Sequence, residues 1–359
     1  MYSAGEKITI YDIAQELGIS IATVSRALNG KSDISEETKK AVLETAGRIG
    51  YRASRTAASL SRKEKKFKAL YPDVIHDYSN EVIRGIQKTQ EELRDFHVSI
   101  DMETIENEAE AFAIRIQELA NQDCDGVMLI PPEDERKLSI MLRKMDLRNM
   151  PLVTMTTDLD KDNRLFSVQS NGQVAGRMAA EMLGILLGKG ARVAVVTGQM
   201  TSVVHIRTAE GFKKEAENQG LRVEGVFEHH DNPARAYVLA ETLLCEHSDL
   251  DGIYLATANS VTFCNRLIEL GFAGKIKLVA SDVFPKMGDF IKEGLVSATI
   301  FQNPFLQGRL ASRYLFEHVT ENRQFPEDEI LLDPQIVLRS NLEIYEKRLM
   351  EAMSNDILF

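Results

Sequence analysis

The chain has 359 residues, which is too long for one ordinary core and indicates two or three domains. Its hydrophobic content of 44% and charged content of 27% are typical of a globular protein, and no apolar run approaches the length of a membrane span. Residues 1–66 contain 12 Lys/Arg against 8 Asp/Glu, whereas the remainder contains 31 against 46. The net charge of −11 therefore does not exclude nucleic acid as a partner, because the N-terminal part is basic.

The cysteines Cys124, Cys245 and Cys264 are isolated, odd in number and set in apolar surroundings. This pattern predicts buried free thiols and a reducing compartment. No basic-plus-apolar signal opens the chain, so we expect a cytoplasmic protein with no membrane partner.

Residues 8–60 contain three short helical patterns. Thr9 precedes the first helix, with Asp12 three residues later, and Gly18 ends it. Ser20 is placed to cap the second helix, and Ser35 to start the third. The apolar positions of the three helices are Ile13, Ala14 and Leu17, then Ile21, Val24, Ala27 and Leu28, and finally Val42, Leu43, Ala46 and Ile49.

Two short helices joined by a tight glycine-containing turn, with a third packed across them, form the helix-turn-helix pattern. The exposed face of the second helix carries small polar side chains and one arginine, which suit entry into a DNA major groove. The alternative is an ordinary three-helix surface module with solvated polar residues. The residues on this face are Ala22, Thr23, Ser25, Arg26 and Asn29.

The segment that follows is rich in small residues and leads into a basic run from Arg62 to Lys68. It has one marginal helical turn, around residues 54–61. Helices this short are unstable alone, so the segment is either a solvated linker or a hinge helix that folds on DNA.

From Phe67 onward, strand and helix patterns alternate, which predicts parallel sheets covered by helices. One helix is expected from Gly172 to Leu187. The expected strands are 67–71, 98–102, 126–130, 152–156 and 165–168, then 193–197, 223–227, 252–256, 276–280 and 298–301.

An internal echo divides this body. The acidic turn NQDCDG, ending at Gly126, precedes one apolar strand, and SDLDG, ending at Gly252, precedes another. The echo predicts two similar α/β lobes, with ligand bound between them beyond the carboxyl ends of the strands.

No catalytic motif is present, so we do not expect an enzyme, a cofactor or a metal site. The sequence from Gly188 to Gly190 is interpreted as a helix-ending turn, and His229-His230 as a loop pair without ligand-spaced partners.

Polar residues follow several strands and would converge on the cleft, where they suit the hydroxyl groups of a sugar or polyol. For each residue alone, loop capping is the alternative interpretation. Tyr78 could contact a sugar ring or pack in the core. The strand-end residues are Asp158, Arg207, Asn259, Asp282 and Gln302.

The head sequence ITIYDIAQELGISIATVSRALNG, followed by SEETKKAVLETAGRIGYR, closely resembles the DNA-binding head of LacI-type repressors. The body is similar to the core of that family and to ribose-binding periplasmic proteins, through segments such as EVIRGI, DGVMLIPP, RTAEGF and GLVSATIFQNPFLQG. The resemblance covers nearly the whole chain. It implies an all-α helix-turn-helix head on an α/β body of two doubly wound parallel-sheet lobes, like a type I periplasmic binding protein.

The resemblance also implies roles for individual residues of the head. Base contacts fall on Ile21, Ala22 and Arg26. Minor-groove contacts fall on Ala57 and Leu60, where an apolar wedge can kink the duplex. Positions that touch or approach DNA phosphates are Thr9, Tyr11, Ser20, Thr23, Ser25, Asn29, Ser35 and Thr38. Ile10 is also included among the expected DNA-binding residues.

The hinge departs from the family pattern. Tyr51-Arg52-Ala53-Ser54 replaces Tyr-x-Pro-Asn, and Ala57-Ala58 replaces the frequent Ala-Arg pair. Ordering of the hinge on DNA is therefore expected to be weaker, or its groove contacts different.

In the effector cleft, Asp282, Arg207 and Gln302 match ligand positions of the family. Thr156-Thr157 stands where ribose binders carry Asp-Arg, and Thr257-Ala258-Asn259 replaces Asn-Asp, so the ligand is not expected to be held in the ribose manner. The full expected effector set is His76, Tyr78, Thr156, Asp158, Arg207, Thr257, Asn259, Asp282 and Gln302.

Taken together, these features predict a homodimeric transcriptional repressor that binds double-stranded operator DNA and is controlled by a sugar, polyol or sugar derivative. The alternative is a cytoplasmic solute-binding sensor whose head does not bind DNA. The sequence does not identify the effector, the operator, or whether the effector releases or recruits DNA binding. The expected domains are 1–52 for DNA binding, 53–66 for the hinge helix and linker, 67–345 for effector binding and dimerisation, and 346–359 for a C-terminal tail.

Overall fold

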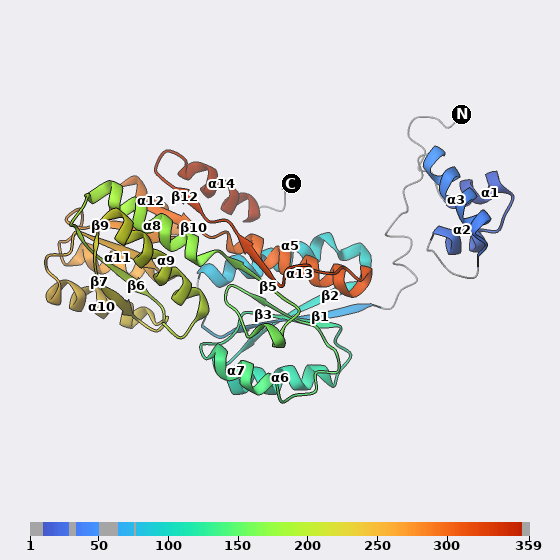
Figure 1. Cartoon of the computed structure of the whole chain (residues 1–359), viewed down its shortest axis with the longest axis horizontal. Coiled ribbons are helices and arrows are strands. Elements are labelled where there is room, and N and C mark those ends of the chain that lie inside the picture. Colours follow the sequence, from blue (N-terminus) through green and yellow to red (C-terminus); the bar gives the residue numbers. More distant parts are fainter. Residues whose placement is uncertain (1–9, 29–33, 50–63, 75–76, 354–359) are drawn as a thin grey trace. The chain divides into compact units, whose positions relative to one another are not determined.

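The structure is a computed structural model that describes residues 10–28, 34–49, 64–74 and 77–353. These residues belong to a small helical head and to a larger α/β body that begins at Lys65 (Figure 1). None of the helices in the described ranges is long and apolar enough to cross a membrane.

The head consists of α1 (Ile10–Leu17), α2 (Ile21–Leu28) and α3 (Glu36–Ile49). Most of the predicted apolar positions form or pack against its core, but Leu43 and Ile21 do not, and they are 54% and 37% exposed. The buried stripe of α3 instead follows Val42, Thr45 and Ala46, at helical spacing, and Leu43 lies off that stripe.

The predicted caps at Ser20 and Ser35 are confirmed. The Ser20 hydroxyl accepts a hydrogen bond from the Thr23 backbone N–H at 3.1 Å, and Ser35 accepts one from Thr38 at 3.2 Å. In each pair, the two hydroxyls are also 2.8 Å apart. Both helices therefore begin with one orphan N–H already satisfied by a serine. Thr9, the expected cap of α1, lies outside the described residues.

The body contains two six-stranded sheets, and the predicted pair of parallel α/β lobes is confirmed. The N-lobe sheet has the order β11-β5-β4-β3-β1-β2, and all its strand pairs are parallel. The C-lobe sheet has the order β12-β10-β9-β8-β6-β7, in which only β12 runs antiparallel to its neighbour. The N-lobe strands are β1 (Lys65–Pro72), β2 (Val98–Ile105), β3 (Gly126–Leu129), β4 (Leu152–Met155), β5 (Phe166–Ser170) and β11 (Glu329–Leu332). The C-lobe strands are β6 (Arg192–Thr197), β7 (Arg222–Glu228), β8 (Gly252–Ala256), β9 (Lys277–Ser281), β10 (Val296–Phe301) and β12 (Gln335–Val337).

Each predicted strand coincides with one of β1 to β10, whereas β11 and β12 were not predicted. The chain passes between the lobes after β5, after β10 and between β11 and β12. These crossings place the two similar lobes side by side, with their connections at one hinge.

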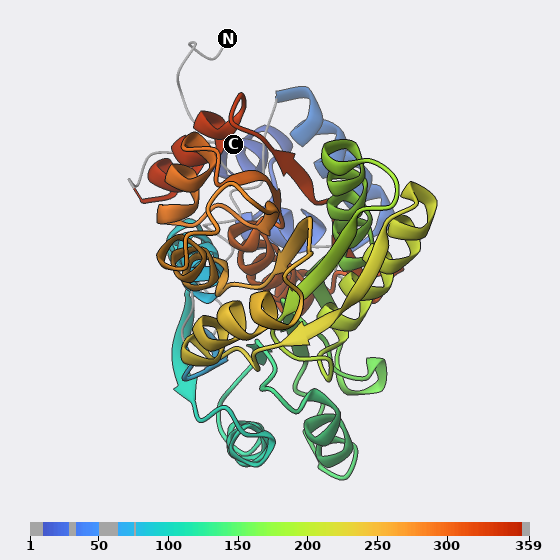
Figure 2. The ribbon, with the colours of Figure 1, turned by 90° about the vertical axis from the view of Figure 1, so that its left-hand side faces the viewer.

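Helices cover both faces of each sheet. In the N-lobe, α5 (Asp77–Glu92) and α13 (Pro304–Glu321) lie on the face opposite α6 (Ala109–Ala120) and α7 (Glu135–Leu142) (Figure 1). In the C-lobe, α8 (Gly172–Leu187) and α9 (Val203–Gln219) pack on one face of the sheet. The other face is covered by α10 (Pro233–Glu246), α11 (Ser260–Glu269), α12 (Pro285–Lys292) and α14 (Leu342–Met353), as Figure 2 shows from the C-lobe side. Short 3₁₀ turns follow α5, at Arg94–Phe96, and β4, at Lys161–Asn163.

The internal echo has a structural counterpart in each lobe. Asp125 accepts a hydrogen bond from the Lys66 backbone N–H at 2.9 Å, and Asp251 accepts one from Arg192 at 2.8 Å. The two residues of each pair are 59 positions apart in both cases. The repeated acidic turn therefore fixes the start of the first strand of each lobe against the strand that follows the turn.

Glycines allow a close helix pair in each lobe. A Cβ atom at Gly85 on α5 would lie 2.0 Å from the Phe305 carbonyl oxygen on α13. In the C-lobe, a Cβ at Gly176 on α8 would lie 2.0 Å from the Thr208 carbonyl oxygen on α9. Since real side chains do not approach backbone so closely, each glycine is required by the packing of its helix pair.

The prediction of three buried thiols is only partly correct. All three cysteines are free, but only Cys264 is buried, Cys124 is half-buried and Cys245 is exposed. Cys245 follows the inward-facing Leu243 and Leu244 on α10, so helical periodicity turns it outward.

Candidate functional site

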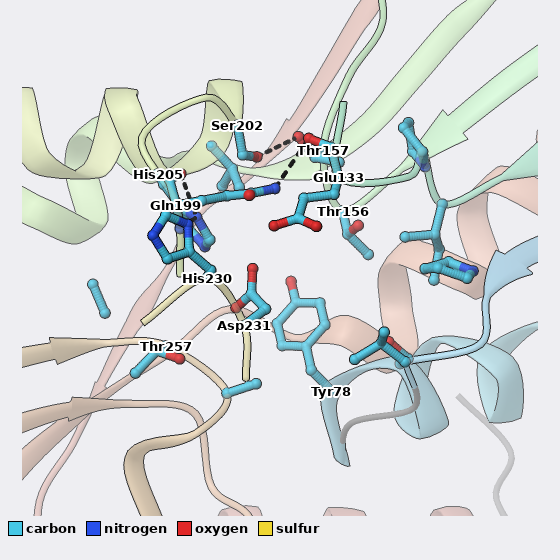
Figure 3. A pocket seen from close by; sticks show the side chains of 18 of the residues that line it. Tyr78, Glu133, Thr156, Thr157, Gln199, Ser202, His205, His230, Asp231 and Thr257 are labelled. Carbon is cyan, nitrogen blue, oxygen red and sulfur yellow. Dashed lines mark hydrogen bonds between the residues drawn. The ribbon is translucent and has the colours of Figure 1, made fainter. Parts of the chain in front are cut away.

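A cavity of about 450 Å³ lies between the lobes (Figure 3). The N-lobe contributes Tyr78 from α5, Glu133 from the loop after β3 and Thr156 from the end of β4. The C-lobe contributes Asp231 after β7 and Asp282 after β9. Because parallel strands end at the same edge of a sheet, the loops of both lobes converge on one space, where the sequence predicted a ligand.

The middle of the cavity is polar. The Tyr78 hydroxyl and the carboxylates of Glu133 and Asp231 point toward one another from different elements (Figure 3). Tyr78 accepts a hydrogen bond from Gln307 Nε2 at 2.8 Å, and burial raises the pKa of its hydroxyl, so it stays a neutral donor. Such a lining offers both acceptors and a donor to the hydroxyl groups of a ligand.

Asp282 lines the cavity and is 1% exposed. Its carboxylate accepts hydrogen bonds from the backbone N–H of Gln302 at 2.8 Å and from the Gln302 side chain at 2.9 Å. Burial raises the pKa of Asp282 to about 7, against the lowering effect of these two bonds, and the nearby Glu81 carboxylate adds to the rise. Near neutral pH, this group therefore exists both as a carboxylate and as a carboxylic acid.

Of the eight predicted effector residues that the structure describes, five line this cavity and three do not. The five are Tyr78, Thr156, Thr257, Asp282 and Gln302. His76 lies outside the described residues. Asn259 is buried at the start of α11, and its backbone N–H donates to the Thr257 hydroxyl at 3.0 Å. It therefore supports the loop that lines the cavity and does not line the cavity itself.

Asp158 and Arg207, also expected at the effector site, line a different hollow between the lobes. Asp158 is buried and accepts two hydrogen bonds of 2.7 Å from the Arg164 guanidinium. Arg207 donates to Glu329 on β11 at 2.7 Å. Each charge is already paired within the body, which explains why neither side chain faces the cavity.

Several cavity residues were missed from the sequence. His230 and Asp231 have positive φ angles of 52° and 47°, and this turn directs Asp231 into the cavity. The signal was present in the segment HHDNP, since Asn232 caps α10 and Pro233 begins it. His229 is buried, with Nε2 2.8 Å from the Thr257 hydroxyl. In the part of the chain that the structure describes, no cluster of three or more His, Cys, Asp or Glu could hold a metal ion.

Nine predicted DNA-contacting residues have side chains that the structure describes, and six of these are exposed on the head. Tyr11 is 65% exposed and Ile21 37% exposed, and Ala22 and Arg26 are exposed on α2. Ser20 and Ser35 are exposed, whereas Thr23, Ser25 and Thr38 are half-buried. Thr9, Asn29, Ala57, Leu60 and the side chain of Ile10 lie outside the described part of the chain.

Two family models match the chain. Residues 69–323 match the periplasmic binding protein domain, and residues 9–54 match the bacterial regulatory proteins of the lacI family. The chain belongs to the periplasmic binding protein domain family, and its head matches the lacI-family model.

Two relatives match parts of the chain at moderate identity. The HTH-type transcriptional regulator RegA of Clostridium saccharobutylicum is 31% identical over 45% of this chain and 46% of its own length. Catabolite control protein A of Streptococcus mutans is 27% identical over 67% of this chain and 70% of its own length. The chain thus spans about half the length of RegA, and 63% of catabolite control protein A from Staphylococcus aureus.

Solved structures show the same fold for the body. A solute-binding protein from Burkholderia graminis, in complex with D-arabinose, matches with a TM-score of 0.72 at 21% identity, covering 79% of this chain and 99% of that protein. A solute-binding protein from Bacillus halodurans, with bound myo-inositol, matches with a TM-score of 0.71 at 16% identity, covering 80% and 99%. The fold class expected from the sequence is confirmed.

Proposed function

We propose that this protein is a sequence-specific DNA-binding transcriptional regulator whose body binds a small sugar or polyol. The observation that carries the proposal is that one chain combines two parts. The head is a helix-turn-helix with an exposed α2 face, and the body has two lobes around a polar cavity of about 450 Å³. The ligands named for the D-arabinose and myo-inositol complexes support the ligand class.

On DNA, α2 enters the major groove and Arg26 contacts base edges. A guanidinium suits the O6 and N7 acceptors of guanine, which it can bind through two parallel hydrogen bonds. The serine-capped starts of α2 and α3 present their remaining N–H groups and positive dipole ends to phosphates. The side chains of α2 then determine the base preference, and the phosphate contacts at the capped helix starts orient the head on the DNA.

Effector binding controls DNA binding because the two binding equilibria are thermodynamically linked. The regulator works as a homodimeric repressor in the cytoplasm, where two heads read two half-sites. A ligand that favours one arrangement of the lobes shifts the dimer toward one spacing of its heads. Since the coupling is reciprocal, DNA must change ligand affinity by the same factor as ligand changes DNA affinity.

Selection of bound fragments from random DNA, followed by gel shift, tests the proposal. Arg26→Ala is expected to relax base preference, with a loss of about 1–3 kcal/mol on the selected site. Lys40→Ala is the matched control, because Lys40 is an exposed cation on α3 that pairs with Glu44. Absence of any sequence preference at moderate salt would reject the regulator and favour a solute-binding sensor.

A thermal-shift screen of neutral sugars and polyols tests the ligand class separately. A ligand that raises the melting temperature should also change DNA affinity. If no sugar or polyol shifts the melting temperature while sequence-specific DNA binding is intact, the sugar-like effector is refuted and the DNA-binding role stands.

A further inference from the structure

The carboxylate of Glu135 joins the two lobes. Glu135 is the first residue of α7 in the N-lobe and is 4% exposed. Its Oε1 accepts hydrogen bonds from the Thr157 hydroxyl of its own lobe and from the Ser202 hydroxyl of the C-lobe at 2.8 Å. Its Oε2 accepts one from the backbone N–H of Val203 in the C-lobe at 3.2 Å. One side chain therefore bonds the loop after β4 and the start of α9.

The contact with Val203 completes the N-terminus of α9 from the opposite lobe. Ser202 is the N-cap residue of this helix, yet its hydroxyl makes no capping bond to the helix and contacts Glu135 instead. An uncapped N-terminus leaves N–H groups without partners and carries positive partial charge. Glu135 supplies the missing acceptor, so separation of the lobes would uncap α9.

One more hydrogen bond between the lobes and one close polar contact accompany the bonds to Glu135. The Thr157 and Ser202 hydroxyls are 3.0 Å apart across the lobe boundary (Figure 3). Gln199 Nε2 of the C-lobe donates to the Glu133 carbonyl oxygen of the N-lobe at 3.0 Å. Thr157, Ser202 and Gln199 are each less than 10% exposed. Hydrogen bonds shielded from water in this way are costly to break and leave unpaired.

Glu135 also separates the two hollows between the lobes. It lines the cavity that holds Tyr78 and Asp282, and it lines the hollow that holds Asp158 and Arg207. A ligand that enters the cavity therefore meets the side chain that holds the lobes together.

We propose that Glu135 is a positioning residue that latches the two lobes and sets the fraction of molecules in which the cleft is closed. Ligand and latch then act on the same equilibrium between open and closed lobes. The apparent ligand affinity depends on the fraction of molecules in the binding-competent arrangement. The latch thus adjusts how strongly effector binding changes the body, although Glu135 need not supply the chemistry that selects the effector.

The latch is expected to depend on pH. Burial raises the pKa of Glu135 to about 7, the Asp158 carboxylate adds to the rise, and the bonds from Thr157, Ser202 and Val203 oppose it. Once the latch opens, water restores the ordinary acidity of Glu135, so the latched form binds the proton more tightly. The latched fraction should therefore fall as pH rises from 5 to 8. Other ionisable side chains on the elements packed here are Asp134, Arg136, Glu133, His205 and Arg207.

Distance measurement by single-molecule energy transfer tests the latch in the full chain without ligand or DNA. Cys245 on α10 is exposed and provides the C-lobe label, and Ile114→Cys on α6, 60% exposed in the parent, provides the N-lobe label. Cys124→Ser removes the half-buried thiol from the background. Glu135→Ala is expected to raise the ratio of open to closed molecules by about tenfold or more.

Three further variants make the result specific. Ser202→Ala should shift the ratio in the same direction, and Glu135→Gln should restore part of the closed population and abolish its pH dependence. Asp160→Ala is the matched control, since Asp160 lines the second hollow but pairs with Arg143 within the N-lobe. Circular dichroism verifies that each variant is folded.

Identical distance distributions in the parent and a folded Glu135→Ala variant would overturn the latch. A shift as large in Asp160→Ala would also overturn it. Because the readout requires neither effector nor operator, its failure leaves the proposed DNA-binding function untouched.

Discussion

Replacement of Asp282 by asparagine is expected to stabilise the ligand-free protein at pH 8. Asp282 is 1% exposed and its partners are two donors from one residue, Gln302. Burial raises its pKa from 3.8 to about 7, so the carboxylate form is disfavoured in the folded state. Asparagine removes the charge and retains a carbonyl oxygen, and the Gln302 amide can rotate to accept from the new NH₂ group. The φ angle of 62° at this position also suits asparagine.

The size of the effect follows from the pKa difference. The change in the pKa of Asp282 from 3.8 to about 7 corresponds to an unfavourable contribution of about 4 kcal/mol at a pH above both values, which is an upper limit for the gain. Because the folded pKa is raised, folding takes up a proton between pH 4 and pH 7. The stabilising effect of that proton is present at low pH and lost as pH rises through 7. We therefore expect the advantage of the variant to shrink by about 2.5 kcal/mol between pH 8 and pH 5.

Urea unfolding at pH 5 and pH 8, followed by circular dichroism, measures this difference. Asp158→Asn is the matched control, because Asp158 is equally buried but paired through two hydrogen bonds with Arg164. Breaking that buried pair should cost about 3–5 kcal/mol at both pH values. A destabilised Asp282→Asn variant at pH 8, or an advantage that does not depend on pH, would refute the reasoning about burial.

Two further predictions concern packing and capping. Gly176→Ala should lower the free energy of unfolding by about 1–3 kcal/mol, because its methyl group would meet the Thr208 carbonyl oxygen. A Cβ atom at Gly47 on α3 would have no atom within 4 Å, so Gly47→Ala should raise helix stability by up to about 1 kcal/mol. If the two glycine substitutions had equal effects in a urea titration, the packing argument would be contradicted. Ser20→Ala should destabilise the head by about 1 kcal/mol, because the hydrogen bond from the Thr23 backbone N–H is lost. Ser20→Asp should retain most of the parent stability, since a carboxylate can accept the same bond. Amide hydrogen exchange at the start of α2 measures both effects.

Much of the fold could be predicted because its signals are local. Buried parallel strands are apolar along their whole length, and each was found near its observed bounds. The short strands β11 and β12 were missed because they lie at the sheet edges and are less uniformly buried. Leu43 was placed in the core because it is apolar, but the neighbouring Thr45 occupies the buried stripe.

The site could be predicted only as far as strand order determines it. Thr156, Asp282 and Gln302 follow strands and reach the cavity, as the rule for parallel sheets requires. Arg207 was expected at the cavity but pairs with Glu329, which lies 122 residues away in the sequence. No local pattern shows that these two charges meet. Asp231 was missed because a turn with positive φ directs it inward. A polar residue at a strand end thus predicts position, but its pairing decides whether it is available to a ligand.

The raised pKa of Asp282 also gives ligand binding a proton signature. A neutral polyol that donates a hydroxyl to Asp282 favours the carboxylate, so the pKa of Asp282 must fall when the ligand binds. At pH 7, close to the ligand-free pKa of about 7, binding would then release a fraction of a proton. Titration calorimetry in buffers of different ionisation enthalpy measures that release, and Asp282→Asn should abolish it. Proton uptake that Asp282→Asn removes would mean instead that the ligand accepts a hydrogen bond from the protonated Asp282, and it would rule out a hydroxyl donor at this position. Uptake that remains in Asp282→Asn would belong to closure of the Glu135 latch.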